Sequence, residues 1–258
     1  MMALRLDFIT QTVPQLAMAA FDLVLPPRCL ACGDELAQDN DLCAPCWSRL
    51  NFISGSLCRV CGRPQGEHAI ADGACGDCLD APPPFDRMRA ALAYDFASKP
   101  MILGLKHRER LEGVGLFAKW MLAAGGPMIE RAEVILPVPV HRMKLVRRGF
   151  NQAAVIAQAI AKQAGKPCPL AALRKIEQTR PQVGLNADER AQNVTEASFT
   201  VPSKQRAWID GKRLLLIDDV YTTGTTTAAC CAVLKRAGAR QIDILTLARV
   251  VNGGDGAI

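Results

Sequence analysis

The chain has 258 residues, half of them apolar and 22% charged, and its formal net charge at pH 7 is +6. That length allows one sizeable domain with a buried core and a smaller module beside it. No apolar stretch approaches the roughly 20 residues of a transmembrane helix, and the moderate basic charge suits phosphorylated ligands or nucleic acid without distinguishing them.

Residues 1–25 are predicted to form an N-terminal helix that packs on the rest of the protein, because apolar residues recur there at helical spacing around a break at Pro14. Asp7 and Gln11 interrupt the apolar stretch that a signal peptide needs. A membrane-surface helix needs several basic residues, and this segment has only Arg5. We therefore expect a cytoplasmic protein that does not contact a membrane.

Residues 26–80 are predicted to form a double zinc ribbon. Eight of the eleven cysteines occur here, in four Cys-x-x-Cys pairs. Because two pairs supply the four thiolates of a tetrahedral site, four pairs predict two closed, structural zinc sites. The predicted ligands are Cys29, Cys32, Cys43, Cys46, Cys58, Cys61, Cys75 and Cys78.

These cysteines have alternative uses. Disulfides require an oxidising compartment, which the missing signal peptide disfavours, and redox-active Cys-x-x-Cys pairs usually occur singly. An iron–sulfur cluster takes the same thiolate ligands, so the sequence does not exclude one. The ligands are expected to combine sequentially, the first pair with the second and the third with the fourth. A cross-braced arrangement, the first pair with the third, is the alternative.

A second domain is predicted over residues 81–258, after the stiff spacer Ala81-Pro82-Pro83-Pro84. It begins with a predicted strand, Met88–Tyr94. Helical apolar spacing follows over Met101–Leu122, interrupted by Gly113 and Gly115.

A basic run follows the next predicted strand and loop, Glu133–Pro139, and precedes a helix that extends to about Gln163. The run contains no acidic residue and consists of His141, Arg142, Lys144, Arg147 and Arg148. A solvated basic face would explain it. Its position after a strand end instead favours a contact of Arg147 and Arg148 with pyrophosphate or nucleic acid.

The stretch Lys212–Thr226 is predicted to be a strand, a loop and the start of a helix. Its apolar residues, Leu214–Ile217, suit a parallel strand buried on both faces, and ligands of open α/β sheets bind at the carboxyl ends of such strands. Asp218 and Asp219 stand at that end. The loop then offers N–H groups and hydroxyls at the positive end of a helix, which favours a phosphate. Together these features predict a ribose 5-phosphate as ligand.

Two further observations concern the same stretch. A Walker B role for the acidic pair would need a phosphate loop of the form G-x-x-x-x-G-K-[ST], which the sequence lacks. The chain is predicted to continue as a helix over Thr226–Ala237 and a closing strand over Ile242–Leu247.

This stretch resembles the signature of type I phosphoribosyltransferases, which bind phosphoribosyl pyrophosphate. The resemblance implies an α/β fold, a parallel sheet with helices on both faces. It also implies that Asp218 and Asp219 bond the ribose hydroxyls as catalytic residues. Magnesium would bridge the pyrophosphate and the ribose. The ligand-binding loop would consist of Tyr221, Thr222, Thr223, Gly224, Thr225 and Thr226.

The chain as a whole resembles the ComF family. The resemblance rests on the cysteine pairs, on Arg147–Gln152, on the terminal motif, and on a polar segment over 173–193 that is either a mobile lid or an ordinary surface loop. That segment contains Thr179, Gln182, Gly184, Leu185, Arg190 and Asn193. The family resemblance implies a competence-associated protein linked to DNA uptake, with a DNA-uptake helicase or a recombination mediator as partner.

Three functions are compatible with these features. The protein is a phosphoribosyltransferase, a competence factor that binds single-stranded DNA, or a regulator that senses phosphoribosyl pyrophosphate without turnover. Aromatic residues make up only 5% of the chain, which weakens a base-stacking platform but not backbone binding by cations. The sequence specifies neither an acceptor substrate nor an oligomeric state.

Overall fold

The computed structural model describes residues 27–37, 41–66, 73–105, 108–176 and 198–251. The predicted N-terminal helix and most of the predicted lid lie outside these ranges. The core is a four-stranded sheet in the order β1-β6-β5-β2, and every neighbouring pair is parallel. Its strands are β1 (Arg87–Ala93), β2 (Val134–Pro137), β5 (Arg213–Tyr221) and β6 (Gln241–Arg249).

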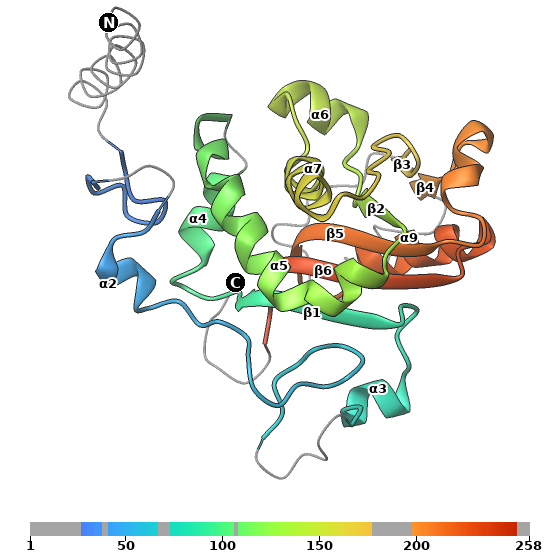
Figure 1. Ribbon diagram of the computed structural model, residues 1–258, viewed down its shortest axis with the longest axis horizontal. Coiled ribbons are helices and arrows are strands. Elements are labelled where there is room, and N and C mark those ends of the chain that lie inside the picture. The colour runs from blue at the N-terminus through green and yellow to red at the C-terminus, as the bar shows by residue number, and fades with distance from the viewer. Residues whose placement is uncertain (1–26, 38–40, 67–72, 106–107, 177–197, 252–258) are drawn as a thin grey trace, which may run out of the picture.

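Helices cover both faces of the sheet, as the sequence predicts. Figure 1 shows α5 (Val114–Arg131) and α7 (Gln152–Ala164) on one side and α9 (Thr225–Arg236) on the other. The central strand β5 is buried on both sides because its apolar run alternates between the two layers: Leu215 packs with α5 and α7, and Leu216 packs with α9.

Several elements differ in extent from the predictions. The predicted helical stretch over Met101–Leu122 is divided into α4 (Lys99–Gly104), a 3-10 helix (Arg108–Gly113) and α5, which passes through Gly115 and extends beyond Leu122. Gly115 does not interrupt the helix, because a side chain there would meet nothing. The other described elements are α2 (Ala44–Trp47), α3 (Gly76–Asp80), α6 (Arg142–Arg148), a 3-10 helix (Ser203–Trp208), and the antiparallel strands β3 (Arg174–Lys175) and β4 (Phe199–Thr200).

The cysteine-rich region packs on the sheet domain in two places. The first zinc module, residues 28–50, contributes Leu30 and Leu50 to the core that surrounds Phe117 of α5. The second zinc module, residues 57–80, joins the layer of α9 and lies beside β1. Figure 1 shows the corresponding short helices, α2 and α3, at different sides of the sheet domain.

The outer edge of β1 is hydrogen-bonded to the cysteine-rich region. The N–H of Met88 donates to the carbonyl oxygen of Val60 at 2.7 Å. Farther along, the N–H of Ala93 donates to the carbonyl of Asn51 at 2.8 Å, and the N–H of Ile53 donates to the carbonyl of Ala91 at 2.9 Å. Loop backbone therefore takes the place of a fifth strand at this edge.

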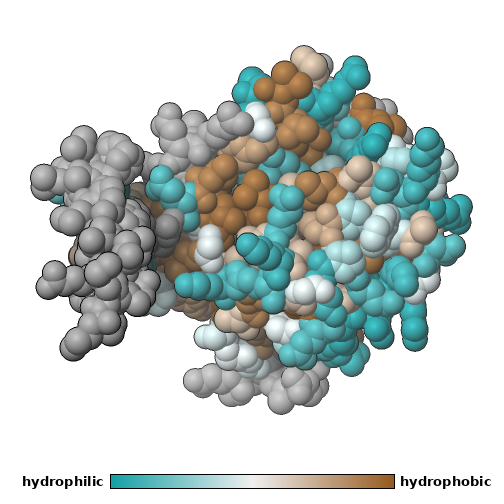
Figure 2. Space-filling model, turned by 45° about the horizontal axis from the view of Figure 1, so that its top comes forward, coloured by the Kyte–Doolittle hydropathy of each residue, from teal (hydrophilic) through white to brown (hydrophobic). Residues whose placement is uncertain are grey.

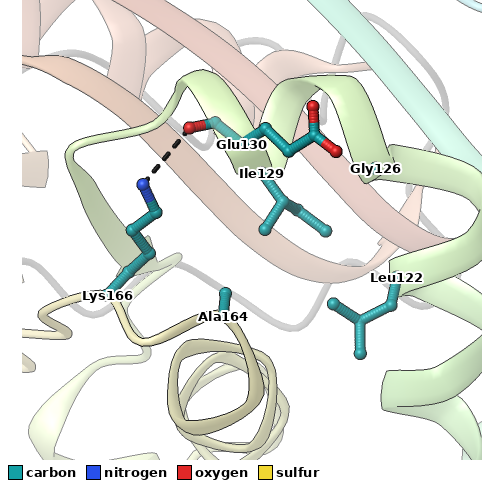
Figure 3. A pocket seen from close by; sticks show the side chains of 6 residues that line it. All are labelled: Leu122, Gly126, Ile129, Glu130, Ala164 and Lys166. Carbon is teal, nitrogen blue, oxygen red and sulfur yellow. Dashed lines mark hydrogen bonds between the residues drawn. The ribbon is translucent and has the colours of Figure 1, made fainter.

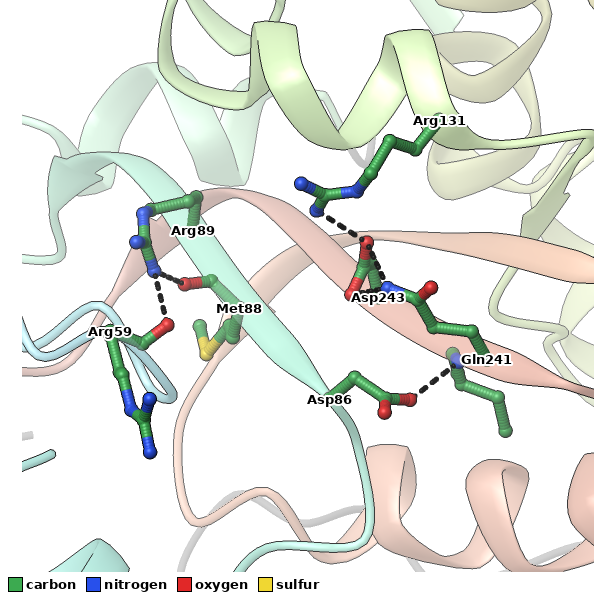
Figure 4. A network of polar contacts seen from close by, with 8 residues as sticks. Arg59, Asp86, Met88, Arg89, Arg131, Gln241 and Asp243 are labelled. Atoms are coloured by element: carbon green, nitrogen blue, oxygen red, sulfur yellow. Dashed lines mark hydrogen bonds and ion pairs between the residues drawn. The ribbon is translucent and has the colours of Figure 1, made fainter.

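Polar contacts connect the start of β6 to the end of α5 and to the residue before β1. Arg131, at the end of α5, forms an ion pair of 3.1 Å with the buried carboxylate of Asp243 on β6. The N–H of Ile242 donates to Asp86 at 2.8 Å, just before β1 begins (Figure 4). None of the described helices is both long and apolar enough to cross a bilayer.

Neighbouring glycines of α5 allow a matched test of this packing. A Cβ on Gly125 would lie 2.7 Å from a methyl carbon of the buried Leu245, whereas a Cβ on Gly126 would meet nothing. We expect Gly126→Ala to stabilise the protein by about 0.5–1 kcal/mol through helix propensity. Gly125→Ala should destabilise it by about 1–2 kcal/mol because overpacking outweighs that gain. Urea unfolding measures both variants, and equal stabilisation by both would contradict the packing.

Candidate functional site

The structure gathers the eight predicted thiols into two groups of four, which are the groups expected from sequential pairing. Within each group all sulfur atoms lie within 4.8 Å of one another. The Sγ atoms of Cys32 and Cys43 are 3.6 Å apart, and those of Cys61 and Cys75 are 3.7 Å apart. Sulfurs of a tetrahedral zinc site with ordinary bond lengths are about 3.8 Å apart. The groups therefore fit zinc, and the cross-braced alternative is wrong.

Backbone N–H groups stabilise one thiolate in each group. The N–H groups of Cys61 and Cys75 donate to Sγ of Cys58 at 3.4 and 3.2 Å, and the N–H of Cys43 donates to Sγ of Cys29 at 3.4 Å. Burial raises the pKa of Cys58, but these N–H groups outweigh burial and lower the pKa to about 6. For Cys29, burial likewise raises the pKa, and hydrogen bonds from backbone N–H groups outweigh it and lower the pKa to about 6. A thiolate is the form that binds metal.

The two predicted carboxylates lie near the carboxyl end of β5, but on different faces of the sheet. Side chains alternate along a strand, so Asp218 points to the layer of α9 and Asp219 to the opposite layer. Burial, followed by the charges of Cys231 and Asp218, raises the pKa of Cys230 in α9. Burial and then the charge of Asp219 raise the pKa of Tyr94, which packs with the other layer.

Asp218 is in an environment that disfavours its charge. Burial first, and then the neighbouring charge of Asp219, raise its pKa well above the ordinary value. The N–H of Asp219 donates to Oδ1 of Asp218 at 2.9 Å, which offsets part of this effect. In the adjacent strand, Thr246 is in register with Asp218, and its buried hydroxyl has no hydrogen-bond partner among the described residues. This strand end therefore holds a carboxyl group of raised pKa beside a buried hydroxyl without a partner among the described residues.

The predicted phosphate loop, Tyr221–Thr226, connects β5 to α9. Gly224 begins the helix with φ +79°, and a Cβ there would collide with the hydroxyl of Tyr221, so only glycine fits. Thr222 and Thr223 are exposed, and the hydroxyls of Thr223 and Thr225 are 2.9 Å apart. The first N–H groups of α9, which have no intrahelical acceptors, lie at this end of the helix, where an anion is favoured.

The predicted basic run lies at the same edge of the sheet. β2 is the neighbour of β5, and the N–H of Val138 just after β2 donates to the carbonyl of Ile217 at 2.8 Å. Asn151 lies at this edge too, because its side-chain amide donates to the carbonyl of Val138 at 3.0 Å. Its side-chain oxygen also caps α7 by accepting from the N–H of Ala153 at 3.1 Å. The segment between them is α6, a helix that the sequence analysis did not predict.

α6 is a projecting helix with no buried residue. Arg147 is exposed and Arg148 is partly buried. Apolar side chains are exposed beside them, and Val146 is 80% accessible. In Figure 2, which brings the top of the molecule forward, brown apolar surface and teal polar surface meet in the region of α6. The basic run therefore borders the edge that carries the phosphate loop.

A separate cavity of about 420 Å³ lies at the opposite end of the sheet. Figure 3 shows it between α5 and the end of α7, where Nζ of Lys166 donates to the carbonyl of Glu130 at 3.2 Å. The N–H of Ile135 near the start of β2 donates to the carbonyl of Pro167, which places this cavity at the amino end of the strands. It is not part of the predicted site.

Sequence reasoning missed residues that contact the site from other strands. Thr246 and Arg249 lie on β6, in register with Asp218 and Tyr221 respectively. Both sit in an apolar segment whose local pattern predicts only a strand, so no local signal distinguishes them. The predicted lid residues Thr179, Gln182, Gly184, Leu185, Arg190 and Asn193 lie outside the described residues.

Comparison with known families identifies the two parts of the chain. Residues 20–79 match the double zinc ribbon domain, and residues 149–255 match the phosphoribosyl transferase domain. The "DNA utilization protein YhgH" of Salmonella typhi is 29% identical over 89% of this chain and all of its own length. "Competence protein F" of Haemophilus influenzae is 28% identical, covering 86% of this chain and 96% of its own.

"Competence protein ComFC" of Bacillus subtilis is 26% identical over 86% of this chain and 94% of its own length. These relatives match both the cysteine-rich region and the sheet domain in a single alignment, so the similarity concerns the combination of the two parts. With its two tetracysteine groups joined to a parallel sheet and a match to the phosphoribosyl transferase domain, the chain is similar over most of its length to competence proteins of the ComF type.

Proposed function

We propose that the protein binds phosphoribosyl pyrophosphate, or a related ribose phosphate, at the carboxyl end of β5. The observation that carries the proposal is the succession of Asp218, Asp219 and the glycine-capped start of α9 at one strand end. A carboxylate accepts hydrogen bonds from sugar hydroxyls, and the helix start attracts a phosphate. A ribose 5-phosphate carries both groups on one small molecule.

Each residue then has a defined task. The N–H groups and hydroxyls of Thr222, Thr223, Gly224, Thr225 and Thr226 hold the 5-phosphate. Asp218 and Asp219 accept from the ribose hydroxyls, with the ring placed across the end of β5 so that both faces are reached. Arg147 and Arg148 approach the pyrophosphate from the β2 side. Carboxylate oxygens suit magnesium, which would neutralise charge on the pyrophosphate when it binds with the ligand.

The proposed biological setting is DNA uptake in natural transformation. The relatives are named for competence and for DNA utilization. The exposed basic residues of α6 suit the backbone phosphates of single-stranded DNA, a second ligand whose binding would weaken with salt. A DNA-uptake helicase or a recombination mediator is the corresponding protein partner in this proposal.

Titration with phosphoribosyl pyrophosphate and magnesium tests the proposal directly. Calorimetry should detect binding, and a colorimetric assay should follow pyrophosphate release in the presence of nucleobases or ammonia. Release would make the protein a transferase, and binding without release would make it a sensor. Heat signals no larger than those of magnesium alone would overturn the proposal.

The acidic pair should determine ligand affinity. Hydrogen bonds to a charged group contribute about 1.5–3 kcal/mol, so Asp218→Asn and Asp219→Asn should each weaken binding roughly ten- to a hundredfold. The exposed Asp80 on α3 offers a matched control, since Asp80→Asn removes the same charge away from the site. Unchanged affinity in both site variants would exclude a diol contact.

Binding should also depend on pH through Asp218, whose pKa is raised by burial and by Asp219. The ribose hydroxyls bond best to the ionised carboxylate of Asp218. At pH values where Asp218 is protonated in the free protein, ligand binding therefore releases that proton. Affinity should therefore rise as the pH increases above the ordinary carboxyl range, and it should level off above the raised pKa of free Asp218. Asp218→Asn should flatten this rise. The ligand's own phosphates titrate in the same way with the wild type and with Asp218→Asn. Identical profiles of affinity against pH for these two proteins would therefore contradict the assignment.

The two tetracysteine groups are closed sites, which makes their proposed zinc ions structural. Elemental analysis should find about two zinc ions per chain, and Cys75→Ser should reduce this to about one. Cys230→Ala, at a buried cysteine outside both groups, should retain both ions. Chelation should lower the unfolding temperature. Iron with visible absorbance in place of zinc would show that the metal assignment is wrong.

A further inference from the structure

We infer that Arg249 links the second zinc module to the phosphate loop, and that it positions the loop for its ligand through Tyr221. This inference rests on the proposed function, because the loop is the proposed phosphate site. It assigns a positioning role to a residue outside the ligand-binding motif. It also gives the second zinc ion a task beyond holding its own module together.

Arg249 contacts both parts. It lies at the end of β6, is only 3% exposed, and is in register with Tyr221 of β5. Its Nη1 donates to the carbonyl oxygen of Cys61, a ligand of the second zinc site. The guanidinium carbon also lies 5.6 Å from the centre of the Tyr221 ring, which is the geometry of a cation–π contact. One buried side chain therefore touches a zinc knuckle and the first residue of the phosphate loop.

Tyr221 transmits this contact to the loop. Its hydroxyl lies against the Cα of Gly224, where it leaves no room for a side chain. Phe85 packs edge-to-face with the same ring, with centroids 6.2 Å apart. The N–H of Val250 donates to the carbonyl of Tyr221 at 2.9 Å, which fixes the backbone beside Arg249. The ring therefore determines where the left-handed turn at Gly224 can lie.

With zinc bound, the four thiolates of the second site would supply the negative charge that makes a buried guanidinium acceptable. Among the residues that the structure describes, Arg249 forms no ion pair with a carboxylate. A zinc ion with four thiolates carries a net charge of about −2, and a buried cation is stable only near such a charge. Loss of this zinc would leave Arg249 buried without compensation and would free Tyr221 to move.

Arg89 provides a matched control because it contacts the same module without touching Tyr221. Its Nη1 donates to the carbonyls of Cys58 and Arg59 at 3.3 Å each, and to that of Met88 at 2.7 Å (Figure 4). The first zinc module gives a second control, since it packs against α5 on the other layer. Effects specific to Arg249 can thus be separated from general damage to a zinc module.

Hydrogen–deuterium exchange of the Val250 and Ala228 amides, which donate to the carbonyl oxygens of Tyr221 and Gly224 in the loop, is the direct test. Arg249→Met should accelerate their exchange about tenfold and weaken phosphoribosyl pyrophosphate binding by a similar factor, because the binding-competent loop is then populated about a tenth of the time. Arg89→Met should leave both within about twofold of the wild type. Zinc loss at the second site through Cys75→Ser should reproduce the Arg249→Met result, and Cys32→Ser in the first module should not.

Arg249→Lys guards against a variant that fails to fold. It keeps the charge beside Cys61 and Tyr221, so loop exchange should return toward the wild-type rate. Wild-type exchange of the Val250 and Ala228 amides in Arg249→Met, or equal acceleration in Arg89→Met, would overturn the inference. The exchange measurement needs no ligand, so it decides the role of Arg249 even if the wild type fails to bind phosphoribosyl pyrophosphate, a result that would instead overturn the proposed function.

Discussion

The burial of β5 on both faces is the constraint on which the rest of the structure depends. Leu214–Ile217 alternate between two helical layers, and β2 and β6 occupy both edges of the strand. Ligands of open α/β sheets bind at the carboxyl ends of such strands, where the chain leaves the sheet. At this end of β5 the chain passes in turn through the acidic pair, the turn at Gly224 and the start of α9. The site is therefore a result of where the apolar run stops.

The sequence was sufficient for those parts of the protein that depend on local pattern. The spacing of the cysteine pairs predicted both tetracysteine groups, and the apolar run before Asp218 predicted the buried strand. The parallel sheet with helices on both faces was confirmed as well. Each of these features is encoded within a few tens of residues, where side-chain type and spacing decide the structure.

The features that were missed depend on register between distant strands. Arg249 reaches Tyr221 only because β5 and β6 pair in a particular alignment, and neither segment specifies that alignment by itself. The separation of Asp218 and Asp219 onto different faces was also not anticipated, because the acidic pair was expected to follow the strand, whereas β5 includes both residues and continues to Tyr221. Helix α6 escaped prediction for another reason: with no buried residue it has no apolar stripe to recognise.

The two zinc modules repeat one local structure but attach to the sheet domain by different interactions. In both, an N–H after the knuckle turn donates back to the first cysteine's carbonyl at 2.9 Å, from Gly33 in one and Gly62 in the other. The first then packs through leucines against α5, whereas the second offers backbone carbonyls to Arg89 and Arg249. Apolar packing tolerates small shifts, but directed hydrogen bonds do not.

The hydrogen bonds along the outer edge of β1 have a consequence for solubility. A parallel sheet that ends in an uncovered strand offers a row of N–H and C=O groups to any other chain, which is a common start of aggregation. Here Asn51, Ile53 and Val60 satisfy that row from within the molecule. The cysteine-rich segment thus covers this edge of the sheet, and unfolding of that segment would expose the edge to strand pairing with other chains.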